Sequence, residues 1–280
     1  MTTKRTDPPG HNGASTPPPA LVLTSTESSS LPPDTEALRK QLDTLKLRYS
    51  REHFEPLARE AAQNHWSHVQ YFARLIEGEA TGREDRCIAR RIKLARFPVI
   101  KTLEQFQWSW PTKINRAQVQ NLFRLSFIEQ KVNPIFLGGV GLGKSHLSIA
   151  LAHAACLRGH SVLFTTAIDI VNTLAAAQAS GSLKRAMQRY IKPTVLLCDE
   201  LGYLPVDKRG ADLLFQIISA RYEQGSTIVT SNRVYKSWPE IFNNDSTLTS
   251  ALLDRLLHHS ETVLIEGRSF RAREKNETAA

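Results

Sequence analysis

The stretch that decides the fold is NPIFLGGVGLGKSHLSIALA, residues 133–152. It starts with a short apolar run, continues through closely spaced glycines and ends in an apolar segment of helical length. The spacing of Gly138, four residues, Gly143, Lys144 and Ser145 is that of a phosphate-binding P-loop. The glycines allow a tight turn whose N–H groups point at a phosphate, at the positive end of the following helix. The stretch therefore predicts a strand, a nucleotide-binding loop and a helix.

The side chains of this loop have separate expected roles. Lys144 is expected to neutralise the β- and γ-phosphates, and the hydroxyl of Ser145 is expected to hold Mg²⁺. The expected cofactors are therefore ATP and Mg²⁺. The predicted nucleotide-binding residues are Gly138, Gly139, Val140, Gly141, Leu142, Gly143, Lys144, Ser145 and His146.

A second motif follows in TVLLCDE, residues 194–200, where an apolar run ends in Asp199 and Glu200. In open α/β sheets, ligands bind beside the carboxyl ends of the strands, so this acidic pair is expected beside the P-loop. We assign Mg²⁺ support to Asp199 and activation of the attacking water to Glu200. A kinase that acts on a metabolite has to exclude water, so the pair favours hydrolysis over transfer to a small molecule.

Two further residues complete the predicted catalytic set. Asn232 ends the next predicted strand and is expected to reach the γ-phosphate or the water. Arg255 lies in SALLDRLLHH, residues 250–259, where the order of motifs suggests an arginine finger that acts on a neighbouring subunit. The adjacent His258 and His259 are expected to be surface or packing histidines.

The composition limits the remaining classes. The net charge of +9 favours an anionic partner, either nucleic acid or an acidic surface, although a basic soluble enzyme is the alternative. The three cysteines lie far apart and form no cluster with histidine, so neither a disulfide framework nor a zinc site is indicated. No apolar run is long enough to span a membrane and no signal-peptide core is present, which predicts a cytoplasmic protein.

The chain is expected to contain two folded parts. Residues 1–33 are rich in Pro, Ser and Thr and are predicted to be a disordered tail, and residues 273–280 are predicted to be a C-terminal tail. Residues 34–97 carry apolar residues at helical spacing and predict an all-helical domain of three or four helices, interrupted at Gly78 and Gly82. Residues 98–272 are predicted to be the ATPase domain.

Within the ATPase domain, apolar runs alternate with helical patterns, which predicts an α/β sheet of five mostly parallel strands. Residues 98–115 are expected to be irregular, with Trp108 and Trp110 as packing anchors, and one helix is expected near 116–130. The predicted strands are 133–137, 161–166, 194–199, 226–231 and 261–265, and the other predicted helices are 144–158, 167–178, 183–191, 208–224 and 247–258.

Together these motifs resemble those of the IstB-like AAA+ helper ATPases of bacterial insertion sequences. The resemblance covers about residues 35–275, and DELGYLP and DRLLHH are its most specific parts. The longer matching stretches are RRIKLARFPVIKTLEQF, GGVGLGKSHLSIALAHAACLRG, LLCDELGYLPVDKRGADLLFQIISARYEQGSTIVTSN and LLDRLLHHSETVLIEGRSFR. The resemblance implies an AAA+ core, ATP-dependent assembly of a homo-oligomer on double-stranded DNA, choice of an insertion site and stimulation of a cognate transposase.

Two alternatives stay open on the sequence. A more distant similarity to DnaC-type helicase loaders and DnaA-type initiators allows a replicative helicase loader, and a small-molecule P-loop kinase is the third possibility. The chain ends soon after GRSFRARE, residues 267–274, so a full helical lid is expected to be missing or vestigial. Arg268 and Arg271 are then the nearby candidates for a sensor-2 arginine.

Two basic segments are candidates for DNA contact. One is a stripe on one face of a predicted helix, which suits phosphate contact but also a solvated surface or a contact with another subunit or the transposase. It consists of Arg83, Arg86, Arg90 and Lys93. The other is Lys184 with Arg185, in an insertion that faces the central channel of initiator-like AAA+ proteins. Neither contains a base-reading motif, so binding with little sequence preference is expected.

Overall fold

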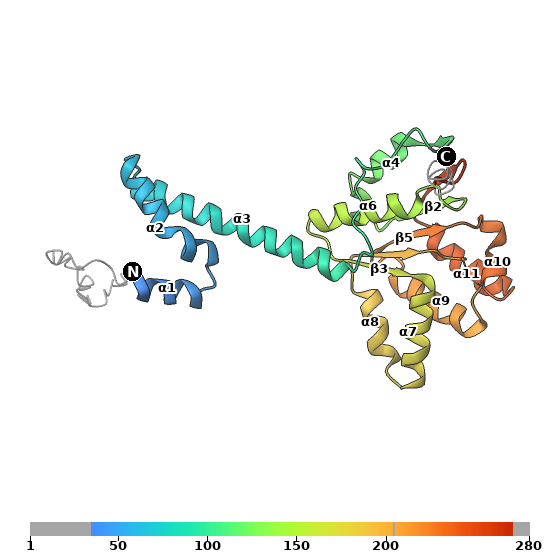
Figure 1. Cartoon of the computed structure of the whole chain (residues 1–280). Helices are drawn as coiled ribbons and strands as arrows, with labels where there is room; N and C mark the ends of the chain where they lie inside the picture. Colours follow the sequence, from blue (N-terminus) through green and yellow to red (C-terminus); the bar gives the residue numbers. More distant parts are fainter. Residues whose placement is uncertain (1–34, 204, 271–280) are drawn as a thin grey trace, which may run out of the picture. The chain divides into compact units, whose positions relative to one another are not determined.

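The computed structural model describes residues 35–203 and 205–270 and contains a six-stranded sheet with the order β1-β6-β2-β5-β4-β3 (Figure 1). All neighbouring strands are parallel except β1, which pairs antiparallel with β6. The strands are β1 Lys113–Ile114, β2 Asn133–Gly138, β3 Val162–Thr166, β4 Val195–Asp199, β5 Ser226–Ser231 and β6 Ser260–Glu266. The expected mostly parallel α/β sheet is confirmed, but the expected number of five strands was wrong by one.

The additional strand is β1, in the segment that was expected to be irregular. It has two residues, too few for an apolar alternation to be visible in the sequence. Lys113 and Ile114 pair with Glu266 and Ile265 at the end of β6, and an ion pair of 3.3 Å joins Lys113 to Glu266. The strand is therefore defined by its partner and not by its own composition.

One face of the sheet is covered by α6 (Lys144–Leu157) with two short helices beside it. Their side chains form a buried cluster with Phe136, Leu197 and Val263 from three strands. The single helix expected near 116–130 is two helices, α4 (Arg116–Leu122) and α5 (Ser126–Glu129). The expectation failed because Leu125 adopts a left-handed conformation between them, with φ of 65°.

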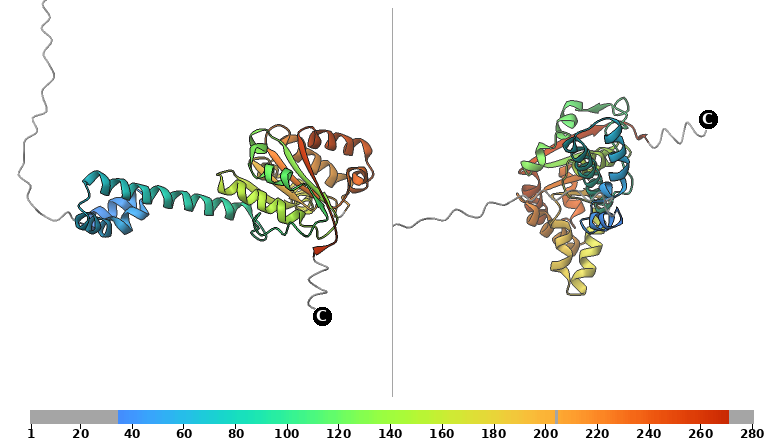
Figure 2. Two further views of the ribbon diagram at one scale, coloured as in Figure 1. Left: turned by 90° about the horizontal axis from the view of Figure 1, so that it is seen from above. Right: turned by 90° about the vertical axis from the view of Figure 1, so that its left-hand side faces the viewer.

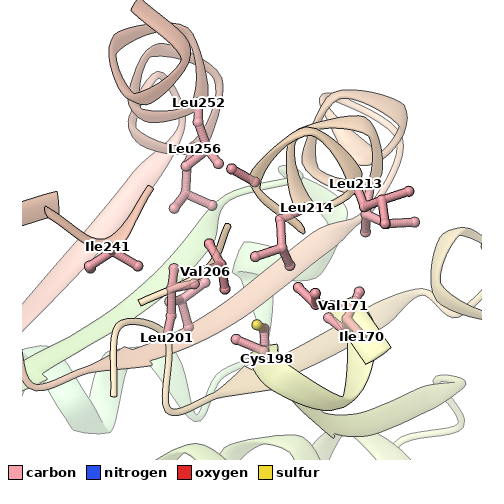
Figure 3. Close-up of a cluster of buried hydrophobic side chains, with 14 of the residues drawn as sticks. Ile170, Val171, Cys198, Leu201, Val206, Leu213, Leu214, Ile241, Leu252 and Leu256 are labelled. Atoms are coloured by element: carbon pink, nitrogen blue, oxygen red, sulfur yellow. The ribbon is translucent and has the colours of Figure 1, made fainter. Parts of the chain in front are cut away.

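The opposite face is covered by α7 (Ala167–Ala179), α8 (Leu183–Ile191), α9 (Lys208–Arg221) and α11 (Ser246–Leu257) (Figure 1). Figure 3 shows apolar side chains of α7, α9 and α11 meeting beside Cys198 of β4 and Leu201, which follows that strand. The short helices η1 (Tyr235–Ser237) and α10 (Trp238–Ile241) were not predicted, since neither is long enough to show a helical period. The sheet is thus a buried layer between two helical layers.

A buried arginine fixes the turn between α9 and β5. Arg221 is 2% exposed and donates six hydrogen bonds, five of them to backbone carbonyl oxygens. Burial lowers its pKa to about 10, which still leaves the guanidinium charged at neutral pH. Because each unsatisfied buried polar group costs about 1–3 kcal/mol, this arginine holds the chain around residues 190–194 and 221–226 firmly in place.

Contacts within the chain divide it into one unit that ends at Tyr71 and one that begins at Phe72. In the first unit, α1 (Thr35–Thr44) and α2 (Arg48–Gln63) are joined by an ion pair of 2.7 Å between Arg39 and Glu55. The division falls within α3, whereas the sequence pattern put a boundary at residue 97, which stays a prediction.

The helix α3 (His68–Ala95) is continuous, so the expectation that Gly78 and Gly82 interrupt it was wrong. A glycine costs only about 1 kcal/mol relative to alanine inside a helix, and good helix formers surround both positions. Three helices therefore precede the sheet in the described chain. The tails predicted for residues 1–33 and 273–280 lie outside the described residues. Among the described residues, no helix combines the length and apolar character needed to cross a bilayer.

Candidate nucleotide-binding site

A cleft of about 680 Å³ opens at the carboxyl ends of β2, β4 and β5, above the P-loop. Because these strands are parallel, the residues that follow them gather at one edge of the sheet. The cleft is lined by the P-loop from Val140 to His146, by Glu200, by Thr230, Ser231 and Asn232, and by parts of the segment 99–111. The predicted P-loop, the acidic residue after β4 and the polar residue after β5 therefore share one cavity of ligand size.

Two glycines explain the shape of the P-loop. Gly143, with φ of +87°, precedes α6, and a Cβ atom there would lie 2.6 Å from the ring of Phe106. Gly138 ends β2, where a Cβ atom would collide with the carbonyl oxygen of Ile265 on β6. Gly138 and Gly139 are not among the residues that line the cleft. The absence of a side chain at Gly138 instead allows β2 to pack closely against β6. Lys144 Nζ lies 2.7 Å from the carbonyl oxygen of Gly139 and donates to it.

His146 lines the cleft and also contacts the segment 99–111. Its Nε2 lies 2.9 Å from the carbonyl oxygen of Thr102, and its ring packs edge-on against Phe106. Burial lowers the pKa of His146, against the opposing effect of the bond to Thr102. This histidine therefore ties the segment 99–111 to α6, as well as lining the cleft.

The carboxylate of Asp199 is the centre of a buried hydrogen-bond network. It accepts a hydrogen bond of 3.0 Å from Ser145 Oγ, and a second one from Thr230 Oγ1. Thr230 Oγ1 in turn accepts a hydrogen bond of 2.9 Å from the backbone N–H of Glu200. The threonine thus joins the two acidic residues, a role that the sequence did not reveal because a threonine in a buried strand is ordinary.

Glu200 lies where the chain leaves β4, with φ of +59°. A left-handed conformation costs a residue with a side chain about 1–3 kcal/mol. The hydrogen bond from its N–H to Thr230 offsets part of this cost. The result is a carboxylate that is exposed to the cleft, directly after the buried Asp199.

The oxygen atoms of Ser145 and Asp199 are suited to Mg²⁺. Adjacent ligands around an octahedral Mg²⁺ ion with bonds of 2.0–2.1 Å lie about 2.9 Å apart. The Ser145 hydroxyl and the Asp199 carboxylate are 3.0 Å apart, and Mg²⁺ prefers oxygen ligands. The donor set and its spacing therefore fit the expected ion.

The other end of the cleft is apolar. Phe106, Val99 and Ile100 line it together with Trp110 and Phe270. Phe270 packs edge-on against Trp110, and its N–H donates a 2.9 Å hydrogen bond to the carbonyl oxygen of Gly141 in the P-loop. Trp110 was expected only to anchor packing, and Phe270 was not expected to take part in the site. Their separation by 160 positions in the chain hid this wall from the sequence.

Comparison with known proteins places the chain among its relatives. The family of IstB-like ATP binding proteins matches residues 40–278. The chain belongs to this family. An insertion sequence IS21 putative ATP-binding protein of Pseudomonas aeruginosa is 40% identical over 234 residues, 84% of this chain and 88% of that protein. An insertion sequence IS5376 putative ATP-binding protein of Geobacillus stearothermophilus is 39% identical over 240 residues, 86% of this chain and 95% of that protein.

Among solved structures, the crystal structure of the DnaC helicase loader aligns with a TM-score of 0.48 and 21% identity, over 59% of this chain and 96% of that one. The AMPPCP-bound DnaA from Aquifex aeolicus aligns with a TM-score of 0.49 and 23% identity, over 63% of this chain and 54% of that one. The resemblance to IstB-like proteins that the motifs indicated is confirmed by the sequence matches.

In this IstB-like chain, Asn232 and Arg255 have different surroundings. Asn232 lines the cleft, and its buried Oδ1 has no hydrogen-bond partner within the described part of the chain. Arg255 lies on α11 outside the cleft, with Cζ 4.7 Å from the ring centre of Phe215 on α9. Arg268 is exposed and does not line the cleft, and Arg271 lies outside the described residues.

The candidate DNA-binding residues lie on two helices. Lys184 and Arg185 are exposed on α8, whose opposite side packs into the core through Leu183 and Met187. Figure 2 shows α7 and α8 side by side, extending away from the sheet. The second set, Arg83, Arg86, Arg90 and Lys93, is exposed on α3.

One member of the α3 set is engaged within the chain. Arg86 forms an ion pair of 3.0 Å with the carboxylate of Glu79, whose side chain is 8% exposed. A buried carboxylate requires a compensating charge. This ion pair therefore gives Arg86 a structural role in addition to any contact with DNA.

Proposed function

We propose that the chain is an ATPase that assembles on double-stranded DNA and helps a transposase to insert an element there. The observation that carries the proposal is the single cleft shared by the P-loop, Glu200 and Asn232, with the Asp199 network beneath it. The names of its relatives, putative ATP-binding proteins of insertion sequences, supply the biological setting.

The chemistry follows from the positions of the side chains. The N–H groups at the start of α6 and the ammonium of Lys144 bind the phosphates, and the apolar wall around Trp110 covers the base. Bound Mg²⁺ would offset phosphate charge at Ser145 and Asp199. Glu200 accepts the proton of the attacking water, and Asn232 orients that water or the γ-phosphate through its amide.

Charge that develops on the γ-phosphate during hydrolysis calls for a cation besides Lys144. Among the described residues that line the cleft, Lys101 is the one lysine or arginine besides Lys144. Lys101 belongs to the segment 99–111 and does not follow one of the strands that carry the catalytic residues. An arginine finger contributes about 10³–10⁵ in rate in related phosphoryl-transfer enzymes. We assign this role to Arg255 acting on the neighbouring subunit, because Arg255 lies outside the cleft of its own chain. Hydrolysis then requires adjacent subunits in a homo-oligomer.

DNA contact is assigned to α8 through Lys184 and Arg185, with the α3 stripe as a second surface. Ammonium and guanidinium groups that contact phosphates give affinity without sequence preference. Subunits that bind along one duplex become neighbours, which couples DNA binding to hydrolysis. The assembled protein would mark the insertion site for the cognate transposase.

A reconstituted insertion reaction tests this function. Transposase, donor DNA and a target plasmid are mixed with ATP, with or without the chain, and insertions are counted by sequencing. We expect insertions to depend on the wild-type chain and to be absent with Lys144→Ala. Equal insertion with and without the chain would contradict the proposal, and loading of a replicative helicase in a parallel assay would favour the helicase-loader alternative.

A further inference from the structure

A cluster of potential metal ligands lies outside the nucleotide cleft, where α9 and α11 end. It consists of Glu223, just after α9, and His258 and His259, just after α11. One carboxylate oxygen and one ring nitrogen from each histidine all lie within 4.8 Å of one another. We propose that these three residues bind a zinc-class divalent ion that links the ends of the two helices.

The ligand types favour zinc over the Mg²⁺ expected in the cleft. Two imidazoles and one carboxylate form a common zinc set, whereas Mg²⁺ prefers oxygen ligands alone. Ligands at tetrahedral angles around zinc lie about 3.3–3.4 Å apart, given bonds of 2.0–2.1 Å. His259 Nε2 and Glu223 Oε1 are 3.5 Å apart, close to that separation. The fourth position would be taken by water.

The backbone that carries these ligands is held in place. The carbonyl oxygen of His259 accepts a 2.8 Å hydrogen bond from the N–H of Asn133, and the side chain of Asn133 donates to the carbonyl oxygen of Leu256. Glu223 adopts φ of +56° in a turn in which the carbonyl oxygen of Arg221 accepts from two N–H groups. Both ligand segments are therefore anchored to the core, and binding an ion requires only side-chain adjustment.

The ring of His258 is also oriented. Its Nδ1 lies 2.7 Å from the hydroxyl oxygen of Tyr222, and the two rings stack with centres 5.9 Å apart. When Nδ1–H donates to the tyrosine oxygen, the lone pair of Nε2 is left for a metal. The rings of His258 and His259 have centres 4.1 Å apart. His258 therefore has the arrangement of a metal ligand whose second ring nitrogen is held by an outer partner, here Tyr222.

The cluster lies close to Arg255, so a bound ion would affect the surface around this residue. Arg255 lies one turn before His259, on α11, and its guanidinium covers Phe215 on α9. An ion that links the ends of α9 and α11 would hold this contact and the surface around Arg255. Metal binding itself does not depend on the function proposed for Arg255, so the two can be tested separately.

The test is an isothermal calorimetry titration of Zn²⁺ into the metal-free, untagged full chain, in excess Mg²⁺ and without nucleotide. Cys87→Ser serves as the reference protein, because Cys87 is an exposed thiol that could bind zinc alone. The other two cysteines do not compete, since burial raises the pKa of Cys156 to about 11 and that of Cys198 to about 12.

We expect one Zn²⁺ per reference chain, with an affinity that falls more than about 100-fold in Glu223→Gln and in His259→Ala, beyond the 10–100-fold typical of outer-shell changes. The matched control His68→Ala removes an exposed histidine on α3 and leaves binding unchanged. Zn²⁺ at 100 times its Kd should raise the unfolding temperature of the reference by about 5–10 °C and leave that of His259→Ala unchanged.

Two results would overturn the proposal. The first is equal zinc affinity in the reference and in His259→Ala, with both proteins folded as judged by circular dichroism. The second is a Co²⁺ spectrum of the reference that lacks the visible absorption of a four-coordinate ion. If His259→Ala fails to fold, His259→Asn and Glu223→Gln carry the same comparison.

Discussion

The nucleotide cleft and the proposed DNA-binding face of α8 differ in how their side chains are held. In the cleft, the hydroxyl of Ser145 on α6 and that of Thr230 on β5 both donate to the buried carboxylate of Asp199, and Thr230 also accepts from the N–H of Glu200. On α8, Lys184 and Arg185 extend into solvent from one short helix. Hydrolysis needs fixed geometry, whereas attraction to a DNA backbone needs only charge of the right sign in reach. Substitutions should therefore act steeply in the cleft and gradually on α8.

A large effect on turnover, with ATP binding retained, is expected from Glu200→Gln. Because only the acceptor for the proton of water is removed, turnover should fall by about 10²–10⁴ while ATP affinity is retained. Phosphate release and binding of a fluorescent ATP analogue measure the two quantities. Glu129→Gln, an exposed position on α5, is the matched control and should keep full turnover. Wild-type turnover in Glu200→Gln would remove Glu200 from its assigned role.

A smaller effect in the same region is expected from Thr230→Val. The change keeps the shape of the side chain but removes the hydroxyl that joins Asp199 to the N–H of Glu200. Turnover should fall by about 10–100-fold, as for other outer-shell positions, and the free energy of unfolding should fall by about 1–3 kcal/mol. Chemical denaturation and phosphate release check both, and unchanged values would mean that the network does not hold the acidic pair.

The comparison between the regions also separates what the sequence could predict from what it could not. The P-loop, Asp199, Glu200 and Asn232 could be predicted as one site because each lies at the end of a strand pattern. Thr230 was missed because its role depends on which strand lies between β2 and β4 in the sheet. The same holds for the wall made by Trp110 and Phe270, whose contact depends on the fold and not on spacing.

Predictions from local sequence also failed where the structure of a segment depends on the residues or strands around it. The two-residue strand β1 forms because β6 offers it an edge, and α3 continues through its glycines because the helix formers around them outweigh the cost. The cluster of Glu223 with His258 and His259 was missed for a third reason. The two histidines are adjacent, but the glutamate is brought to them only by the packing of α9 against α11.

The smallest effect per residue is expected on α8. Lys184→Ala with Arg185→Ala should leave hydrolysis without DNA unchanged and weaken binding to unrelated duplexes about equally. The magnitude of the slope of log affinity against log salt should fall by about 0.9 for each DNA phosphate that the variant no longer neutralises. Fluorescence anisotropy at several salt concentrations measures this slope. Lys40→Ala with Arg59→Ala removes the same charge from α1 and α2 and serves as control.

Selective weakening on one DNA sequence in the α8 double variant would contradict phosphate contact and indicate base recognition. An unchanged slope of log affinity against log salt would mean that α8 does not contact DNA phosphates. The stripe of Arg83, Arg90 and Lys93 on α3 would then be the next surface to change, with Arg86 kept because it pairs with the buried Glu79.

The central claim is that hydrolysis takes place between subunits that DNA brings together, and a mixing experiment tests it most directly. Arg255→Ala keeps a cleft that binds ATP but lacks the arginine finger. Lys144→Ala keeps the arginine finger but has a cleft that no longer binds ATP. Each variant alone should show no DNA-stimulated ATP turnover, and an equal mixture on duplex DNA should recover a substantial part of it. A mixture that stays inactive while labelled subunits exchange, or Arg255→Ala with full DNA-stimulated turnover by itself, would contradict the account.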